Sequence, residues 1–226
     1  MCTEFLMMSP TFLDGGRKMN AKRFVRFYES SFGRKILRKE ANYLRKELKG
    51  RKKVLDIGCG AGFFEAALPE FDIIGLDSSK EMLMEARKRS DKKFVLGSAE
   101  QMSFPDKSFD AAFAVTTLEF LDDYRKAVKE ISRVLRSNGK FVAMILNTKS
   151  KYFRSRAERA DSYFRLARHR DAKQIEHYIS KFFTTKSEYF LGILGTKVFD
   201  TRDKNLASLY VIKGENYNKS DTRHSP

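Results

Sequence analysis

Three glycines stand at alternating positions in the sequence VLDIGCGAGFFEAAL, which runs from Val54 to Leu68. Gly58, Gly60 and Gly62 follow a run of β-formers and precede a helical pattern. Glycine reaches backbone angles that other residues avoid, so one interpretation is a tight strand-to-helix turn. The other is a loop whose bare backbone contacts a ligand directly. The glycines alone do not decide between the two, so the decision depends on the residues around them.

A second residue with a chemical use is Asp77, which ends the run IIGLD 21 residues after Asp56. In an open parallel sheet, ligands bind outside the carboxyl ends of the strands. Peptide N–H groups at the start of a helix are free to meet ligand atoms there. An acidic side chain at the tip of the next strand can accept hydrogen bonds from ribose hydroxyls. The glycine loop and Asp77 therefore predict a site for a nucleoside-bearing cofactor, with a surface capping aspartate as the alternative for Asp77.

Short apolar runs alternate with helical patterns in the centre of the chain. The predicted strands are 52–57, 72–77, 92–97, 110–115 and 140–146. Each is apolar on both faces, as in parallel strands that are covered on both sides. A helix is predicted at 78–90, where Ser78 and Glu81 have capping-box spacing, and another at 122–139. This alternation predicts an α/β fold with a doubly wound, mostly parallel sheet.

The segments on either side of this centre carry amphipathic patterns. Residues 34–50 place one apolar stripe along a helix, which we expect to pack on the edge of the sheet. The stripe consists of Leu37, Ala41, Leu44 and Leu48. Residues 153–167 also keep helical spacing, with arginines on the other side, which predicts one basic amphipathic helix. Its apolar positions are Phe153, Ala157, Ala160, Phe164 and Ala167, and its arginines are Arg154, Arg156, Arg159, Arg165 and Arg168.

The last part of the chain is predicted to change from helix to strand. Residues 184–195 have a helical pattern, and 196–214 resemble two strands joined by a charged turn. Residues 215–226 are polar and are expected to form a loose tail.

Charge is spread unevenly along the 226 residues. The net charge of +16 divides into +9 for residues 1–52, −1 for 53–148 and +8 for 149–226. Basic flanks attract anionic partners such as nucleic acid, phospholipid headgroups or an acidic small molecule; a surface tuned for solubility is the equal alternative.

The cysteines, Cys2 and Cys59, are too few for a disulfide framework or a metal site. With no apolar stretch of membrane-spanning length, the protein is interpreted as soluble and cytoplasmic.

Four motifs in the centre resemble those of the class I methyltransferases that use S-adenosylmethionine, within the broad group related to ubiquinone-biosynthesis methyltransferases. They are VLDIGCGAG, IIGLDSS, GSAEQMSFPDKSFDAAFAVTTLEFLDD and EISRVLRSNGKFVAMIL, within residues 50–147. One motif would not decide the family, but four in this order do. The spacing GxGxG also agrees with methyltransferases over nicotinamide enzymes. The resemblance implies a Rossmann-like, seven-stranded sheet with an antiparallel C-terminal hairpin, and S-adenosylmethionine as cofactor with S-adenosylhomocysteine as product.

The resemblance also implies roles for residues of the first two motifs. Gly58 and Gly60 would lie under the methionine part of the cofactor, with Asp56 ordering the loop. Asp77 would hold the ribose. The full set of predicted cofactor-binding residues is Tyr28, Asp56, Gly58, Cys59, Gly60, Asp77, Ser78, Met82, Ala99, Glu100 and Thr116.

The other residues of this set also have implied roles. Ser78 and Met82 would flank the ribose and adenine, and Ala99 and Glu100 would meet the adenine edge. Thr116, at the end of the fourth strand, would lie near the reactive methyl group. In such a site the protein mainly holds donor and acceptor in line and excludes water.

No catalytic residue is assigned from the sequence. A base is needed only if the acceptor arrives protonated. Glu119 is a candidate, although an acidic residue that starts a helix is the favoured interpretation. His169 and His177 are expected on the surface, and no metal ligand is predicted.

Acceptor specificity is expected to come from outside the common core. The segment with Phe24, Phe27, Tyr28 and Phe32 and the insert at 152–183 are both aromatic and basic. They are interpreted as a lid and pocket for an anionic or aromatic small molecule, or equally as an ordinary amphipathic cover.

Three functional interpretations follow. The favoured one is methyl transfer to a small molecule; the others are an RNA methyltransferase that uses the basic flanks and a non-catalytic cofactor-binding protein. The expected organisation is a helical cap at 1–50, a methyltransferase domain at 51–213 with a helical insert at about 151–183, and a tail at 214–226.

Overall fold

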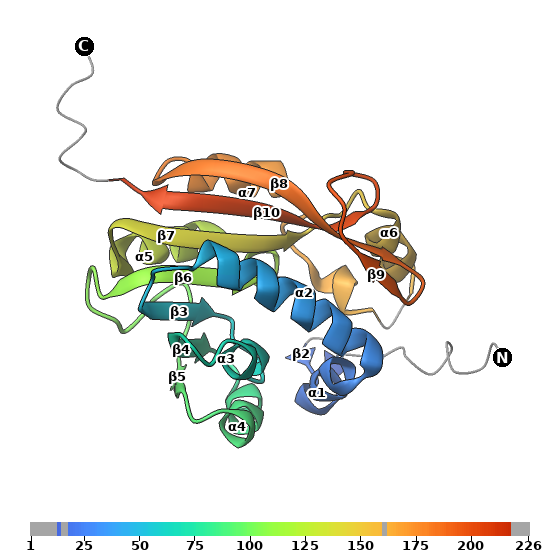
Figure 1. The fold of residues 1–226 in the computed structure, drawn as a ribbon, viewed down its shortest axis with the longest axis horizontal. Coiled ribbons are helices and arrows are strands. Elements are labelled where there is room, and N and C mark those ends of the chain that lie inside the picture. The colour runs from blue at the N-terminus through green and yellow to red at the C-terminus, as the bar shows by residue number, and fades with distance from the viewer. Residues whose placement is uncertain (1–12, 15–17, 160–161, 218–226) are drawn as a thin grey trace, which may run out of the picture.

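A central sheet organises the computed structural model, which describes residues 13–14, 18–159 and 162–217. The sheet strands are β3 (Lys53–Ile57), β4 (Asp72–Asp77), β5 (Lys93–Leu96), β6 (Phe109–Val115), β7 (Leu135–Leu146), β8 (Phe183–Leu194), β9 (Lys197–Phe199) and β10 (Ala207–Asn216). Their order is β5-β4-β3-β6-β7-β10-β8-β9 (Figure 1). Two further short strands, β1 (Leu13–Asp14) and β2 (Lys18–Met19), pair only with each other.

The sheet is parallel in one half and antiparallel in the other. Strands β5, β4, β3, β6 and β7 run parallel, with Val54 beside Ile73 of β4 and Ala111 of β6. Strands β7, β10, β8 and β9 run antiparallel. This confirms the predicted α/β class with a mostly parallel sheet and antiparallel C-terminal strands. The short strand β9 brings the sheet to eight strands, one more than predicted.

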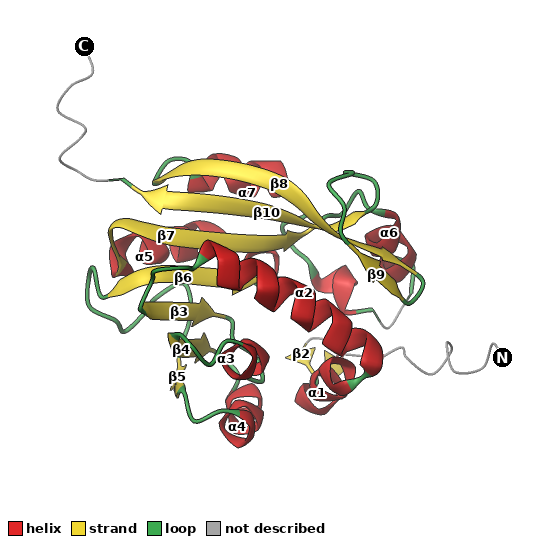
Figure 2. Cartoon of the chain, in the orientation of Figure 1, coloured by secondary structure: helices red, strands yellow, loops and turns green. Residues whose placement is uncertain are grey.

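Helices cover both faces of the sheet (Figure 2). One face carries α2 (Ser31–Glu47), α3 (Phe63–Ala67) and α6 (Lys151–Ala157), and the other carries α5 (Tyr124–Val134) and α7 (Ala172–Ile179). Two more helices, α1 (Ala21–Glu29) and α4 (Lys80–Arg89), and two 3₁₀ turns, η1 (Leu118–Phe120) and η2 (Tyr163–Leu166), lie around the ends of the strands. Alternate strand residues supply the two cores, since Leu55 packs on one face and Val54 on the other. Among the described residues, no helix is long and apolar enough to span a bilayer.

Helix α2 lies over a face of the sheet, so the predicted position at the edge was wrong. Its buried Leu44 belongs to the same core as Val54, Phe113, Val142 and Val211, which come from four neighbouring strands. In Figure 1, α2 crosses in front of β6 and β7. Because β10, β8 and β9 extend the sheet beyond β7, the strands under α2 are central strands.

The helix predicted at 122–139 ends at Val134, where β7 begins. The carbonyl oxygens of Arg133 and Val134 accept hydrogen bonds from the backbone N–H groups of Lys107 and Ser108. The side-chain amide of Asn216 donates to the carbonyl of Leu135. These long-range partners replace the next helical hydrogen bonds and draw the chain into the sheet.

The helix predicted at 78–90 forms as α4, but its N-cap is Ser79. The Ser79 hydroxyl accepts the N–H of Met82 at 3.2 Å and donates to Glu81 at 2.8 Å. Ser78, the predicted cap, stands one residue earlier and lines a cavity.

The basic amphipathic helix predicted at 153–167 is interrupted. Helix α6 ends at Ala157 and η2 starts at Tyr163, while Ala160 lies outside the described residues. Phe153 and Ala167 are nevertheless buried and Arg154 and Arg165 are exposed, as predicted, whereas Arg156 and Arg159 are half-buried.

The segment 184–195 was predicted as a helix and forms β8. Thr, Tyr, Phe and Ile suit an extended chain, and β8 pairs along its length with β10, for instance Tyr189 with Tyr210. The two predicted strands at 196–214 exist, but β8 separates them in the sheet. Strand β10 runs on to Asn216, so the predicted tail begins later than residue 215; residues 218–226 lie outside the description.

Candidate functional site

A cavity of about 870 Å³ opens at the carboxyl ends of β3, β4, β5 and β6. Helix α1, the glycine loop and the start of α4 line one part, and η1 and η2 line another. Its volume is within the range of small-molecule sites. Because parallel strands bring their carboxyl ends to one edge, residues that are far apart in the sequence meet here.

The glycine loop at the end of β3 has a left-handed backbone at each of its three glycines. The φ angles of Gly58, Gly60 and Gly62 are +75°, +52° and +74°. A Cβ on Gly58 would lie 2.5 Å from the Thr117 side chain, and one on Gly60 would lie 3.2 Å from the Phe24 ring. The tight-turn interpretation is therefore correct, and the space that the missing side chains leave is filled partly by Thr117 and Phe24.

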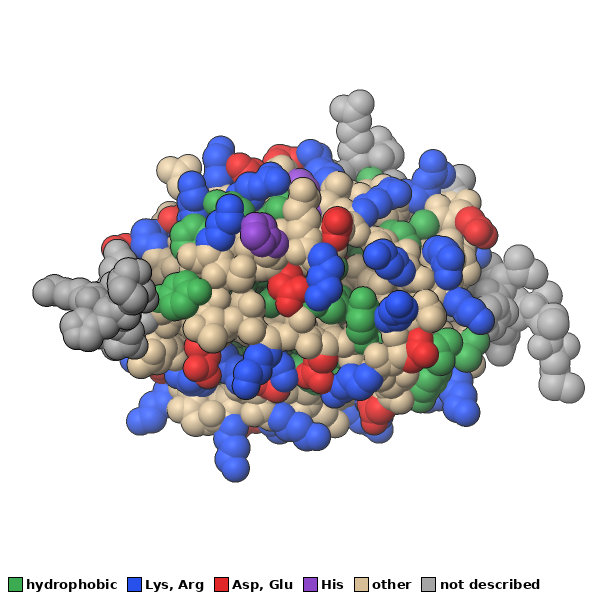
Figure 3. Space-filling model, turned by 90° about the horizontal axis from the view of Figure 1, so that it is seen from above, with side chains coloured by type: hydrophobic (Ala, Val, Ile, Leu, Met, Phe, Trp, Pro, Cys, Tyr) green, Lys and Arg blue, Asp and Glu red, His purple; other side chains and the backbone are tan. Residues whose placement is uncertain are grey.

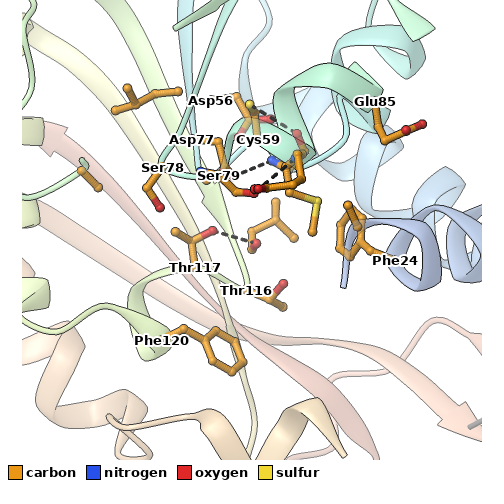
Figure 4. Close-up of a pocket in the computed structure, with 18 of the residues that line it drawn as sticks. Phe24, Asp56, Cys59, Asp77, Ser78, Ser79, Glu85, Thr116, Thr117 and Phe120 are labelled. Atoms are coloured by element: carbon orange, nitrogen blue, oxygen red, sulfur yellow. Dashed lines mark hydrogen bonds between the residues drawn. The ribbon is translucent and has the colours of Figure 1, made fainter. Parts of the chain in front are cut away.

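Asp77 joins the glycine loop to α4 at the tip of β4. Its Oδ2 accepts the N–H of Gly60 at 2.9 Å, and its Oδ1 accepts the N–H of Ser79 at 2.8 Å (Figure 4). Burial raises the pKa of this carboxyl, and the backbone hydrogen bonds oppose the rise. Each oxygen retains acceptor capacity toward the cavity that Asp77 lines.

Two buried carboxyl groups, those of Asp56 and Glu65, lie behind the loop. Asp56 and Glu65 are each 1% exposed, and Asp56 Oδ2 and both carboxylate oxygens of Glu65 have no hydrogen-bond donor. Burial, and then repulsion from Glu65, raises the pKa of Asp56. Burial raises the pKa of Glu65 to about 7. Two buried like charges this close favour sharing a proton. The sequence analysis missed Glu65, whose signal was an acidic residue inside the apolar run FFEAAL.

Aromatic rings and two threonines form the other part of the cavity. The rings of Phe120 and Tyr163 stack with centroids 4.2 Å apart, and the Tyr163 hydroxyl donates to the Thr116 carbonyl at 3.4 Å. Thr116 has a φ of +47°, a costly conformation for a β-branched residue. In Figure 4, Phe24 and Phe120 lie on two sides of this space, with Thr116 between them. The sequence analysis did not single out Phe120 or Tyr163.

Residues 55–143 match the methyltransferase domain family. The fold also matches a crystal structure from Thermotoga maritima, described as an S-adenosylmethionine-dependent methyltransferase and possible histamine N-methyltransferase. That match has a TM-score of 0.74 and 25% identity, and it covers 87% of this chain and 95% of the other. The centre of this chain is thus a methyltransferase domain, and its fold is that of an S-adenosylmethionine-dependent methyltransferase. Its cofactor is S-adenosylmethionine, as predicted.

Curated relatives of this methyltransferase match it over their shared centre. A demethylmenaquinone methyltransferase of Thermotoga maritima is 38% identical over 106 residues, which are 43% of this chain and 46% of the relative. A sterol 24-C-methyltransferase of Aspergillus fumigatus is 31% identical over 130 residues, which are 52% of this chain and 34% of the relative. The chain thus spans about half or less of the length of these relatives.

Ten of the eleven predicted cofactor-binding residues of the methyltransferase line the one cavity. They are Tyr28, Asp56, Gly58, Cys59, Gly60, Asp77, Ser78, Met82, Ala99 and Thr116. Glu100 does not line it, because its Oε1 accepts the N–H of Asp123 at 2.8 Å and so holds the start of α5. The aromatic segment that we expected to set acceptor specificity also has only some of its residues at the cavity. Phe24 lines the cavity, whereas Phe32 is buried in the core.

The acid–base candidates of the methyltransferase lie outside the cavity lining. Glu119 is buried, its Oε1 accepts the N–H of Leu146 at 2.9 Å, and burial raises its pKa to about 7. It thus fixes the end of β7 and stands apart from the acceptor space. His169 contacts the Leu121 carbonyl, and His177 is exposed on α7.

Proposed function

We propose that this protein transfers the methyl group of S-adenosylmethionine to a small-molecule acceptor. The observation that carries the proposal is a single cavity with two chemically different parts. One part presents the glycine loop and the Asp77 carboxylate, and the other presents the stacked Phe120 and Tyr163 rings. A donor and an acceptor held in these two parts would meet at Thr116.

The residues present fit S-adenosylmethionine. The Asp77 oxygens accept the N–H groups of Gly60 and Ser79, and because a carboxylate oxygen can accept more than one hydrogen bond, they could also accept from the two ribose hydroxyls. Apolar side chains of Met82 and Ala99 line the cavity beside Ser78 and offer a surface for the adenine. Gly58 and Gly60, with Tyr28 opposite, would enclose the methionine part. We propose these roles for the ten predicted residues that line the cavity.

The reaction requires positioning more than acid–base chemistry. Bound S-adenosylmethionine supplies a methyl group that its sulfonium already makes electrophilic. The strained Thr116 and the Phe120–Tyr163 wall would orient the acceptor, and α1 and η2 would exclude water. We assign no general base.

A small acceptor is favoured over RNA by the lining of the acceptor part. Phe120 and Tyr163 line it together with Leu121, Leu166 and a single arginine, Arg168, and the names of the quinone and sterol relatives describe small acceptors. Lys and Arg side chains are spread over the face shown in Figure 3 with Asp and Glu between them, which suits a solubilising surface. We further propose that the protein acts in the cytoplasm.

Ligand binding and turnover test the proposal. S-adenosylhomocysteine should raise the melting temperature, because it binds only the folded protein, and NAD should not. Incubation with S-adenosylmethionine and a panel of quinols, phenols, amines and thiols should then yield a methylated product. No shift with S-adenosylhomocysteine would contradict the cofactor assignment. Binding without turnover would favour the non-catalytic alternative, and methylation of RNA alone would favour the nucleic-acid alternative.

A further inference from the structure

Helix α1 forms a wall of the cavity over the glycine loop. Phe24 and Tyr28 of α1 both line the cavity, and their rings lie 4.9 Å apart. Tyr28 stacks on Phe63 of α3 at 4.9 Å and 28°. A ligand held beside Asp77 and Gly60 would thus lie against α1, and α1 would slow its exchange with solvent.

Arg89, the last residue of α4, connects this wall to the loop beneath it. Its Nη1 donates to the Ala61 carbonyl of the glycine loop at 2.5 Å, and its Nη2 lies 3.1 Å from Glu29 Oε1 at the end of α1. Its guanidinium carbon is 3.8 Å from the centre of the Phe63 ring. One side chain therefore contacts α1, the glycine loop and α3.

The two ends of this connection differ in exposure. The Arg89 side chain is 17% exposed and the Glu29 side chain 58%. The guanidinium is fixed on the core side by the carbonyl and the ring, whereas its ion pair with Glu29 faces solvent. The exposed ion pair is the weaker contact and is the one that can break while the core stays folded.

We propose that Arg89 is a positioning residue that holds α1 closed over the bound cofactor, with Glu29 as its releasable partner. This rests on the proposed function, since the cofactor is the ligand that α1 would retain. Glu29 directly follows Tyr28, so loss of the ion pair loosens the turn that carries a cavity-lining ring. The ion pair sets how fast the ligand leaves, and leaves the contacts made by Asp77 unchanged.

Dissociation of S-adenosylhomocysteine, measured by surface plasmon resonance, tests the proposal. Glu29→Gln should raise the off-rate about twofold to fivefold, the range expected for an exposed ion pair. Rising salt should accelerate release from the original protein and have little effect on the variant. Arg89→Met, which also loses the Ala61 and Phe63 contacts, should show a larger effect, and Arg89→Lys an intermediate one.

Glu70→Gln is the matched control. It removes an exposed ion pair with Arg45, 2.5 Å long, and neither residue lines the cavity or belongs to α1. Its off-rate should equal that of the original protein. Melting temperatures of Glu29→Gln and Glu70→Gln should agree, which separates closure of α1 from overall stability. If Arg89→Met fails to fold, Glu29→Gln still decides the question.

Hydrogen exchange measured without ligand distinguishes a failure of this proposal from a failure of the proposed function. Amides of α1 should exchange faster in Glu29→Gln, while those of α2 stay unchanged. Faster exchange with no binding of S-adenosylhomocysteine to any variant would overturn the cofactor assignment and leave the α1 contact standing. Unchanged exchange together with an unchanged off-rate would overturn the role of Arg89.

Discussion

The centre of the chain and its flanks contribute to the cavity by different means. The centre, residues 53–146, is nearly neutral and offers backbone N–H groups, glycines and buried carboxyls such as Asp77. The flanks are strongly basic and bring aromatic rings to the cavity, Phe24 and Tyr28 before the centre and Tyr163 after it. Two basic residues of the flanks, Lys22 and Arg168, line it as well.

This difference separates two tasks. Fixed backbone dipoles and buried carboxyls hold one ligand in a defined geometry, so a change there is costly. Ring surfaces accept ligands of many shapes through apolar contact, so a change there alters preference more than it alters binding of the cofactor. Substitutions at the glycine loop and the buried carboxyls should affect stability and cofactor affinity, and substitutions of the rings beside Thr116 should affect the acceptor.

The largest effect is expected at the buried carboxyl pair of the centre. The folded-state pKa of Glu65 is about 7, above its ordinary 4.5, so its contribution to stability is full below pH 4.5 and is lost as pH rises through 7. Glu65→Gln should remove this loss and be more stable than the original protein at pH 8.5, by roughly 1 to 3 kcal/mol. Urea unfolding at pH 5.5 and 8.5 measures it.

An exposed carboxyl is the control for Glu65. Glu70→Gln removes an ion pair with Arg45 on the surface and should give less than about 1 kcal/mol at either pH. Equal pH dependence in Glu65→Gln and the original protein would show that the pair is not protonated in the folded state.

Asp77→Ala tests the cofactor part directly. The variant should fold, because the side chain lies at a strand tip, and should bind S-adenosylhomocysteine more weakly by about 1 to 3 kcal/mol, the cost of leaving hydrogen-bonding groups unpaired. Isothermal titration calorimetry gives the affinity. Asp72→Ala, at the exposed start of the same strand, should bind as the original protein does. The same affinity in both variants would place the ribose elsewhere.

Phe120→Leu tests the acceptor part. Loss of the stack on Tyr163 should cost about 0.5 to 1.5 kcal/mol in acceptor binding, seen as a higher KM for an acceptor found in the panel, with unchanged affinity for S-adenosylhomocysteine. Phe182→Leu, which disturbs the Tyr178 ring pair outside the cavity, is the control. A loss of cofactor affinity in Phe120→Leu would end the division between the cofactor part and the acceptor part of the cavity.

The smallest effect is expected from the basic surface. Arg154→Gln with Arg165→Gln, both exposed, should change cofactor affinity by less than about 0.5 kcal/mol. Fluorescence anisotropy with a short structured RNA should show weak binding in the original protein. Tight binding that falls steeply with salt and disappears in the double variant would instead make nucleic acid the leading acceptor class.

The centre was largely predictable because its signals are local. Strand β4 forms over the residues predicted for it, Asp72 to Asp77, and the glycine loop has the backbone that its composition indicated. Each apolar run, turn and cap there is encoded within a few neighbouring residues. The order of these signals also identified the family.

The flanks and the lining of the acceptor part were decided by tertiary structure. The segment 184–195 has a helical pattern and becomes β8 because β10 offers a full row of backbone partners, and the helix predicted to end at Gly139 ends at Val134 for a similar reason. The sequence likewise presents Glu100 as a ligand contact, whereas α5 takes its carboxylate. Sequence alone thus determined the parallel sheet, the loop and Asp77, because short-range patterns encode them. Only the packed structure decided that Phe120 faces Tyr163 and that Arg89 reaches Glu29, because those contacts join segments more than forty residues apart.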